Sequence, residues 1–291
     1  GFVESVDFHR DSAVRGVEVR DVGPSARTFG FYSADYEFLA PSGWSGEVLH
    51  RRMTGMLGPG AVLCAQPGDV VAARKVFTAG ARCSLVVEEP TLLEFLDEHG
   101  WRAGSIEVVS RARMSPALDA SLAAVFRRFR AKCSALELEV ALVEFLGRAV
   151  PELFGRTSVA ATRAAASSAP KAAERMREVL EDDPAETIDL AALAREVGLS
   201  RFGALRAFKR QFGLPPHAYQ LSMRLGLARR SLRHGHKPAE VAAEYGFVDQ
   251  SHFTHHFKRL IGIAPAEYAR IGAAHRAVAG QSRMNRGVSP E

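Results

Sequence analysis

The stretch Gly246–Tyr268 reads GFVDQSHFTHHFKRLIGIAPAEY, and an earlier part of the chain repeats its pattern. The earlier copy lies in residues 190–219, LAALAREVGLSRFGALRAFKRQFGLPPHAY, and the later copy in residues 238–268. Gly198 aligns with Gly246 at an offset of 48 residues, whereas the Phe-Lys-Arg triplet of each copy aligns at an offset of 49, so the second turn holds one extra residue. Such a duplication indicates two copies of one supersecondary unit.

Each copy has the pattern of a helix, a tight turn and a second helix. Gly198 and Gly246 stand where the first helix must end in a left-handed conformation, which glycine adopts without steric cost. Ser200 and Asp249 follow and supply side-chain oxygens that can cap the second helix. This pattern predicts a helix-turn-helix, whose second helix enters the DNA major groove.

A helical wheel at about 100° per residue separates the inner from the outer face of each second helix. The inner face holds Ala204, Phe208 and Phe212 in the first copy, and Phe253 and Phe257 in the second. The residues that we expect to contact DNA are Ser200, Arg201, Phe202, Arg206, Lys209, Arg210, Gln250, Ser251, His252, His255, Lys258 and Arg259. A solvated helix face is the alternative, but two copies place Lys-Arg at the same helical phase, which favours DNA.

The pattern GFxxQSHFxxxFKRxxGxxPxxY in Gly246–Tyr268 resembles the signature of AraC/XylS-type bacterial transcription regulators. The similarity extends over about residues 172–270. It implies two helix-turn-helix units joined by a long helix over about Pro216–Leu232, with each second helix in successive major grooves. It also implies that Arg206 reads a base, whereas His255 stands where such regulators often have arginine.

The charge of the chain is unevenly distributed. The formal net charge is +5, but residues 195–270 contain 13 Lys/Arg and 5 Asp/Glu, and residues 1–194 carry a net charge of −5. A basic segment joined to an acidic one predicts an anionic polymer as the partner of the basic part.

The first 110 residues have a β pattern, with short apolar stretches separated by glycine, proline and serine. Pro59-Gly60 and Pro67-Gly68 predict turns that flank one short strand, as in a small antiparallel barrel or sandwich. We therefore expect an α+β protein, with an N-terminal cupin-like β-barrel, two following helices and a C-terminal all-α double helix-turn-helix domain.

Apolar residues recur at helical spacing between Pro116 and Leu153, which predicts two helices with a break near Lys132–Ser134. Their stripes either pack on their own barrel or pair with a second subunit, and periodicity does not distinguish the two. The Ala/Ser-rich segment after them has the composition of a linker. The predicted organisation is a barrel over 1–112, a helical dimerisation segment over 113–154, a linker over 155–170, the DNA-binding domain over 171–271 and a flexible tail over 272–291.

The N-terminal part resembles the effector-binding barrel of the same regulators more loosely, and the stretch GPGAVLCAQPGDV carries that resemblance. His50 is the only histidine between His9 and His99, and no HxH spacing occurs, so we expect no metal site and no cofactor. The candidate effector-binding residues are Tyr36, Phe38, His50 and Arg52, although a solvated strand end and plain core are the simpler interpretations.

These patterns predict a bacterial, ligand-responsive regulator that binds double-stranded DNA as a homodimer, without enzymatic activity. RNA polymerase would be a further partner if the regulator activates transcription. The alternatives are a metal-dependent cupin enzyme fused to a DNA-binding module and a structural DNA-binding protein without an effector. Three cysteines without CxxC spacing, no secretion signal in the first residues and no long apolar run predict a cytoplasmic protein.

Overall fold

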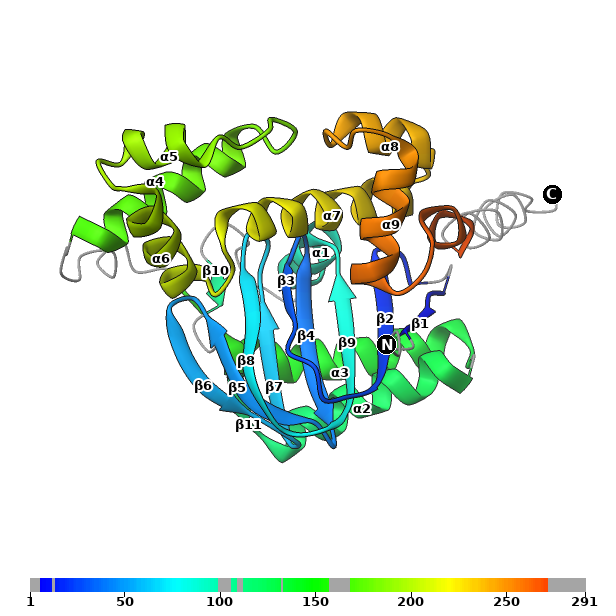
Figure 1. The fold of residues 1–291 in the computed structure, drawn as a ribbon. Coiled ribbons are helices and arrows are strands. Elements are labelled where there is room, and N and C mark those ends of the chain that lie inside the picture. The colour runs from blue at the N-terminus through cyan, green and yellow to red at the C-terminus, as the bar shows by residue number, and fades with distance from the viewer. Residues whose placement is uncertain are drawn as a thin grey trace.

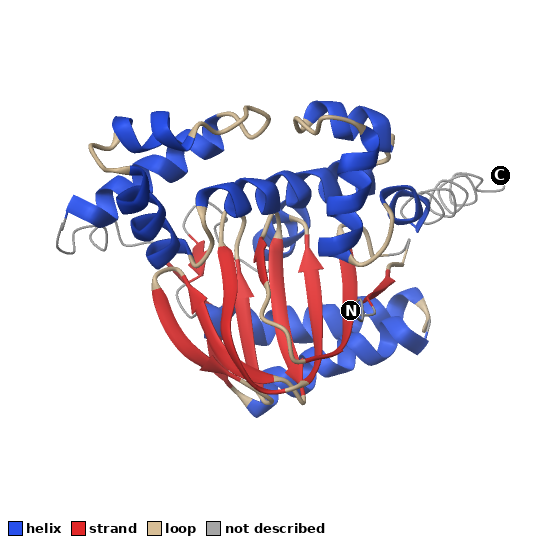
Figure 2. Ribbon diagram, viewed as in Figure 1, coloured by secondary structure: helices blue, strands red, loops and turns tan. Residues whose placement is uncertain are grey.

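The computed structural model describes residues 6–11, 14–98, 106–108, 112–131, 133–156 and 168–271. The N-terminal half contains two antiparallel sheets and a pair of covering helices, and the C-terminal half is helical (Figures 1 and 2). One sheet has the strand order β1 (Val6–His9), β2 (Val17–Ser25), β9 (Gly80–Val87), β4 (Tyr36–Ser42), β7 (Ala61–Ala65) and β11 (Ala112–Met114). The other has the order β3 (Gly30–Tyr32), β8 (Val70–Thr78), β5 (Ser45–His50) and β6 (Met53–Leu57). A separate pair joins β10 (Ile106–Val108) to β12 (Phe154–Arg156).

This arrangement confirms the α+β class and an antiparallel N-terminal part. The hydrogen bonding of the described strands makes a barrel-like pair of sheets and does not close them into one barrel. The two proline-glycine turns lie where the sequence predicts them, since Gly60 and Gly68 have φ of +84° and +89° on either side of β7.

A helix interrupts the region for which the sequence predicts only β-structure. Helix α1 (Glu89–Glu98) follows β9 directly and buries Leu92 and Leu96, which lie four residues apart and therefore on one helix face. The expectation of β-structure alone is wrong for this segment, because a short apolar run does not distinguish a strand from a buried helix.

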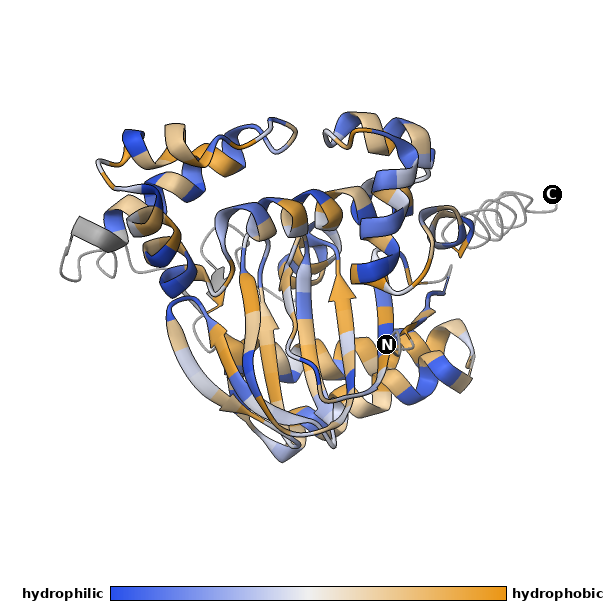
Figure 3. Ribbon diagram, viewed as in Figure 1, coloured by the Kyte–Doolittle hydropathy of each residue, from blue (hydrophilic) through white to orange (hydrophobic). Residues whose placement is uncertain are grey.

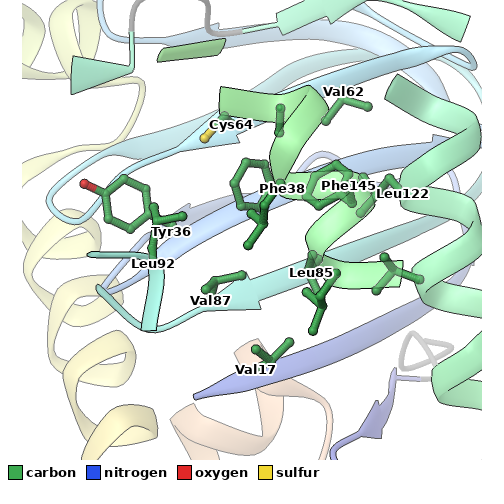
Figure 4. Close-up of a cluster of buried hydrophobic side chains, with 14 of the residues drawn as sticks. Val17, Tyr36, Phe38, Val62, Cys64, Leu85, Val87, Leu92, Leu122 and Phe145 are labelled. Carbon is green, nitrogen blue, oxygen red and sulfur yellow. The ribbon is translucent and has the colours of Figure 1, made fainter. Parts of the chain in front are cut away.

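Helices α2 (Pro116–Ala131) and α3 (Ala135–Leu153) cover the six-stranded sheet. The break between them falls as predicted, and Ser134 caps α3 with a capping box to Glu137. Both apolar stripes pack on their own sheet: Phe145 of α3 meets Phe38 of β4 edge to face, with ring centroids 5.0 Å apart (Figure 4). These stripes are therefore core, and the alternative in which they pair with a second subunit is wrong for them.

The C-terminal helices are α4 (Ser168–Asp182), α5 (Leu190–Glu196), α6 (Arg201–Phe212), α7 (Pro216–His234), α8 (Pro238–Glu244) and α9 (Gln250–Ile261). They form two small cores, one around Phe208 and one around Phe257, and α7 contributes to both. The predicted long helix over Pro216–Leu232 is thus confirmed as α7. Residues 157–167 of the predicted linker and the predicted tail 272–291 lie outside the described residues, and the domain boundaries stay predictions.

Helix α7 lies across one end of the sheets and contacts β3, with α6 and α9 extending on either side of the strands (Figure 1). Hydrophobic residues concentrate on the central strands beneath it (Figure 3). None of the described helices is long and apolar enough to cross a membrane.

Candidate nucleic-acid interface and the joint between the domains

Both turns of the duplicated unit have the geometry that the sequence predicts. Gly198 and Gly246 each have a φ of +67°. The Ser200 hydroxyl accepts a hydrogen bond from the Gly203 N–H at 3.1 Å, and the Asp249 carboxylate accepts one from the His252 N–H at 2.7 Å. Helices α6 and α9 therefore begin at equivalent, capped positions.

The inner and outer faces of α6 and α9 are also as predicted. Ala204, Phe208, Phe253 and Phe257 are fully buried, whereas all twelve candidate DNA-contacting residues are exposed. Phe202 is 73% exposed, which is unusual for a large aromatic side chain and suits a contact surface. The structure thus brings the twelve residues to two equivalent helix faces, and their role in binding DNA stays a prediction.

The cations on these faces are available for phosphates. Among the described residues, no ion pair engages the side chains of Arg206, Lys209, Lys258 or Arg259. Exposed cations without carboxylate partners can neutralise the phosphates of a polyanion and release its counterions.

The two sheets and their covering helices α2 and α3 form one unit, the β-domain. Helix α7 packs closely on this β-domain through its other face. The Ser222 hydroxyl accepts a hydrogen bond from the Tyr32 N–H at 2.8 Å. One turn further, a Cβ at Gly226 would lie 3.2 Å from the Tyr32 carbonyl oxygen, so glycine allows this close approach.

Buried charges hold the same joint together. The Tyr268 hydroxyl donates to Glu18 at 2.7 Å, and the Arg10 guanidinium pairs with the same carboxylate. Although burial alone would raise the pKa of Glu18, Arg10, Arg229, Arg233 and the Tyr268 hydroxyl lower it to about 2. Glu18 is therefore a carboxylate that the C-terminal domain helps to keep ionised.

Arg233 of α7 makes the second charged contact. Its guanidinium lies 2.5 Å from Asp35 and 2.7 Å from Glu88, and all three side chains are largely buried. Sequence reasoning missed this joint because its partners lie up to 250 residues apart.

The four candidate effector-binding residues have structural partners. Tyr36 and Phe38 belong to the core under α2 and α3 (Figure 4). The His50 ring lies 2.9 Å from Asp69, which also accepts from Arg51 at 2.7 Å. Arg52 pairs with Glu174 of α4. Their assignment as an effector site stays a prediction, and these contacts do not add to it.

The hairpin tip between β5 and β6 has a strained backbone. Arg51 and Arg52 have φ of +46° and +67°, a region that L-residues other than Asn and Asp rarely adopt. Each arginine is held by a carboxylate, one within the β-domain and one on α4. The tip is therefore a second point at which the β-domain contacts the helical domain.

A cleft of about 560 Å³ separates α9 from the segment between β2 and β3. Arg27 and Thr28 line one side, and His255, Lys258 and Arg259 line the other. Part of the predicted DNA-contacting face of α9 thus borders the β-domain in this arrangement.

Among the described residues, no group of three or more His, Cys, Asp or Glu side chains could hold a metal ion. No observation on this part of the chain therefore supports the alternative of a metal-dependent enzyme.

A family of helix-turn-helix domains matches residues 193–271. The chain is 36% identical over 104 residues to the probable transcriptional regulator LumQ of Photobacterium leiognathi, covering 34% of this chain and 42% of that protein. It is 37% identical over 89 residues to the transcriptional activator RhaS of Salmonella arizonae, covering 30% and 32%. The match thus spans less than half of the length of these relatives.

Two solved structures are similar at lower levels. ToxT of Vibrio cholerae O395 is 14% identical with a TM-score of 0.43, covering 92% of this chain and 98% of ToxT. A probable AraC family regulator of Rhodopseudomonas palustris is 26% identical with a TM-score of 0.33, covering 35% and 97%. With TM-scores below 0.5, neither adds to the assignment, which depends on the duplicated helix-turn-helix. Residues 193–271 are thus an AraC/XylS-type helix-turn-helix domain.

Proposed function

We propose that this chain is a bacterial transcription regulator that binds double-stranded DNA through α6 and α9 and responds to a small molecule. The observation that carries the proposal is the pair of equivalent, capped helices with fully buried phenylalanines on one face and exposed polar and basic residues on the other. The proposal includes a cytoplasmic location and no enzymatic activity.

The two helices would share the work of recognition. Arg206 lies in the middle of the exposed face of α6 and would read a base, because its planar guanidinium matches the acceptors of guanine. Lys258 lies in the last turn of α9 and would contact phosphate as a point charge.

Gel-shift titrations against promoter fragments from the chromosome that encodes the chain test this proposal. We expect Arg206→Ala to cost about 1–3 kcal/mol and to relax one base position. Lys258→Ala should weaken binding to all sequences alike and reduce the salt dependence by about one phosphate contact. Arg127→Ala, an exposed cation on α2, is the control and should bind as the wild type does. Unchanged binding by both helix variants would refute the assignment.

The regulator would act as a homodimer, and α3 offers a face for it. While one face of α3 is core, Leu136, Val140 and Val143 are 68%, 44% and 45% exposed and follow one helical stripe. Two copies of α3 related by a two-fold axis would bury this stripe against its own counterpart.

Sedimentation equilibrium of the full chain tests the dimer. Val140→Glu places a charge in the centre of the stripe and should shift the protein to monomer. Ala120→Glu places the same charge at an exposed position of α2, so it is the matched control and should leave the dimer intact. A dimer that survives Val140→Glu would refute this interface. Contact with RNA polymerase belongs to the proposal only if the regulator activates.

A further inference from the structure

Arg224 lies in the middle of α7, and its guanidinium holds backbone from both helix-turn-helix units. It donates to the carbonyl oxygens of Pro184 at 2.5 Å, Ala185 at 2.9 Å and Glu186 at 2.7 Å, all in the connection between α4 and α5. It also donates to the carbonyl oxygen of Gly246 at 3.0 Å, in the turn between α8 and α9. One side chain thus joins the first unit to the second at a point beside their shared helix, and we call these contacts the brace.

The two units also touch each other directly at the brace. A Cβ at Gly246 would lie 2.2 Å from the carbonyl oxygen of Ala185, so glycine allows the turn to approach the connection this closely. At Gly198, the equivalent position of the first unit with the same φ of +67°, a Cβ would have no neighbour within 4 Å among the described residues. The close approach therefore comes from the contact between the units. In Figure 1, the loop that follows α4 lies above α7 and extends toward α8.

Further hydrogen bonds shape the connection that Arg224 holds. The Asp183 carboxylate accepts from the N–H groups of Ala185 at 2.9 Å and Glu186 at 3.1 Å, which closes a turn. Gln220, one turn before Arg224 on α7 and 4% exposed, donates to the Glu186 carbonyl oxygen at 2.7 Å. Because α4 and α5 share a core with α6, a tie to their connection holds the whole first unit.

The chemistry of Arg224 suits a link between backbone segments. A guanidinium has five N–H donors in one rigid plane, whereas a lysine ammonium is a point charge without such geometry. Four hydrogen bonds from Arg224 reach four carbonyl oxygens, and among the described residues no carboxylate forms an ion pair with it. Its contacts therefore hold backbone in place and do not serve to neutralise an acid.

We propose that Arg224 is a positioning residue that fixes the distance and angle between α6 and α9, and thereby sets the spacing between the two DNA subsites that the chain accepts. Helix α7 alone connects the two cores along one line, and a single helix limits bending and rolling of the units less than a helix with a second tie beside it. The brace supplies that second tie. This role depends on the proposed function, since it concerns how α6 and α9 meet DNA together.

The geometry of DNA makes such a constraint measurable. Successive major grooves on one face of the duplex are about 10 base pairs apart, and one inserted base pair shifts the second subsite by about 3.4 Å and about a tenth of a turn. A rigid pair of helices cannot follow this shift and loses base contacts of one unit. One lost base contact weakens binding by about tenfold or more. A pair without the brace can adjust and keeps more of these contacts.

Gel-shift titrations of the full chain against its promoter fragment, and against fragments with one base pair inserted or removed between the two subsites, test the proposal. The wild type should bind the altered fragments about tenfold or more weakly than the unaltered one. In Arg224→Met this ratio should fall to about threefold or less. A variant that is merely less stable would bind all fragments more weakly by the same factor, so its ratio would stay that of the wild type.

Two variants separate the brace from the charge of Arg224. Arg230→Met removes a cation from the same helix, but Arg230 lies 4.0 Å from Asp35 of the β-domain, so this matched control should keep the ratio of the wild type. Arg224→Lys keeps the charge and loses the planar set of donors, so its ratio should fall between those of the wild type and Arg224→Met. A wild-type ratio in Arg224→Lys would overturn the role of the guanidinium geometry.

The glycine of the second turn gives an independent test from the other side of the brace. Gly246→Ala places a methyl group against the carbonyl oxygen of Ala185 and should also lower the ratio. Gly198→Ala carries the same backbone strain without that contact, so it is the matched control and should keep the ratio. Equal ratios in the two alanine variants would count against the contact between the units.

Distances between the units test the brace without DNA. Spin labels at Arg195→Cys of α5 and Ala239→Cys of α8, both exposed positions, report the separation by double electron–electron resonance. Cys133→Ser removes the native cysteine that is not fully buried. The wild type and Arg230→Met should give one narrow distance distribution, and Arg224→Met a broader or shifted one.

The two kinds of measurement fail independently. An unchanged distance distribution in Arg224→Met, or an unchanged ratio between the fragments, would overturn the positioning role while DNA binding through α6 and α9 stands. Unchanged DNA binding by the α6 and α9 variants would instead refute the regulator, and the spin-label distances would still show whether Arg224 holds the two units together.

Discussion

Replacing Arg233 by methionine tests how the two domains are held together. The guanidinium lies 2.5 Å from Asp35 and 2.7 Å from Glu88, and the side chain is 7% exposed. Methionine keeps much of the apolar stem but leaves both carboxylates without this partner, and the remaining arginine near Asp35 among the described residues is Arg230, at 4.0 Å. Breaking a buried ion pair on one side costs about 3–5 kcal/mol when the remaining charge stays buried.

The free energy of unfolding that Arg233→Met loses has an upper bound, because the two domains can separate. Because Asp35 belongs to the β-domain and Arg233 to α7, water can reach the orphaned carboxylates if the domains separate. The loss therefore cannot exceed the free energy of docking, which already includes the cost of exposing the joint. We expect Arg233→Met to undock the domains before it unfolds either one.

Urea denaturation, followed by both tryptophan fluorescence and circular dichroism, distinguishes these outcomes. The wild type should show its transitions closer together than the variant, because docking couples the two domains. Limited proteolysis should cut the variant faster. Arg230→Met, on the same helix and 38% exposed, is the matched control and should change little. An Arg233→Met protein with unchanged midpoints and proteolysis would refute the reasoning.

Three further predictions concern the turns and the buried acid. Gly246→Ala should lower the stability more than Gly198→Ala, although both glycines have a φ of +67°, because only at Gly246 would a Cβ lie 2.2 Å from a backbone oxygen. Thermal unfolding measures the difference, and equal losses of stability would contradict this reasoning. The ionised Glu18 should contribute to the free energy of unfolding fully above pH 4.5, its ordinary pKa, and this contribution should be lost as the pH falls toward 2. In acid titrations, Glu18→Gln should therefore make the free energy of unfolding less dependent on pH, and an unchanged dependence would exclude Glu18 as its source. Arg52→Gly should change the stability by no more than about 1 kcal/mol, because relief of backbone strain at φ +67° offsets the loss of its half-exposed ion pair with Glu174. Arg51→Gly should destabilise clearly, because it removes the buried contact to Asp69. Chemical denaturation ranks the two variants, and the reverse order would refute this account.

Local patterns predicted the helix-turn-helix half well. Left-handed glycines, capping side chains and helical phase are encoded within a few residues of where they act, so Gly198, Ser200 and Phe208 could be assigned from neighbours alone. The same locality explains the correct turns at Gly60 and Gly68.

The buried charges at the joint between the domains could not be predicted in this way. In β2, Val17 and Val19 alternate with Glu18 and Arg20, and such alternation is typical of a strand with one face in the core and one in solvent. Here both faces are covered, because α2 and α3 pack on the valine side and the second sheet with α7 covers the charged side. A period of two residues separates the faces, but it does not show what covers each one.

The double use of α7 limits how an effector can act. One set of its residues, including Tyr219 and Leu232, enters the cores of the two helix-turn-helix units, so this single helix sets the relative placement of α6 and α9. A different set, Ser222, Gly226 and Arg229, faces the β-domain. A ligand at this face would contact the helix beside the two cores, and bending α7 would disturb both of them. Undocking instead removes the β-domain side chains that pack on them, Val70 and Tyr32 on one and Phe8 on the other. In the proposed regulator, the difference in free energy that an effector uses would therefore lie in docking. Because α9 borders the β-domain beside Lys258, docking would also limit how freely DNA reaches that helix.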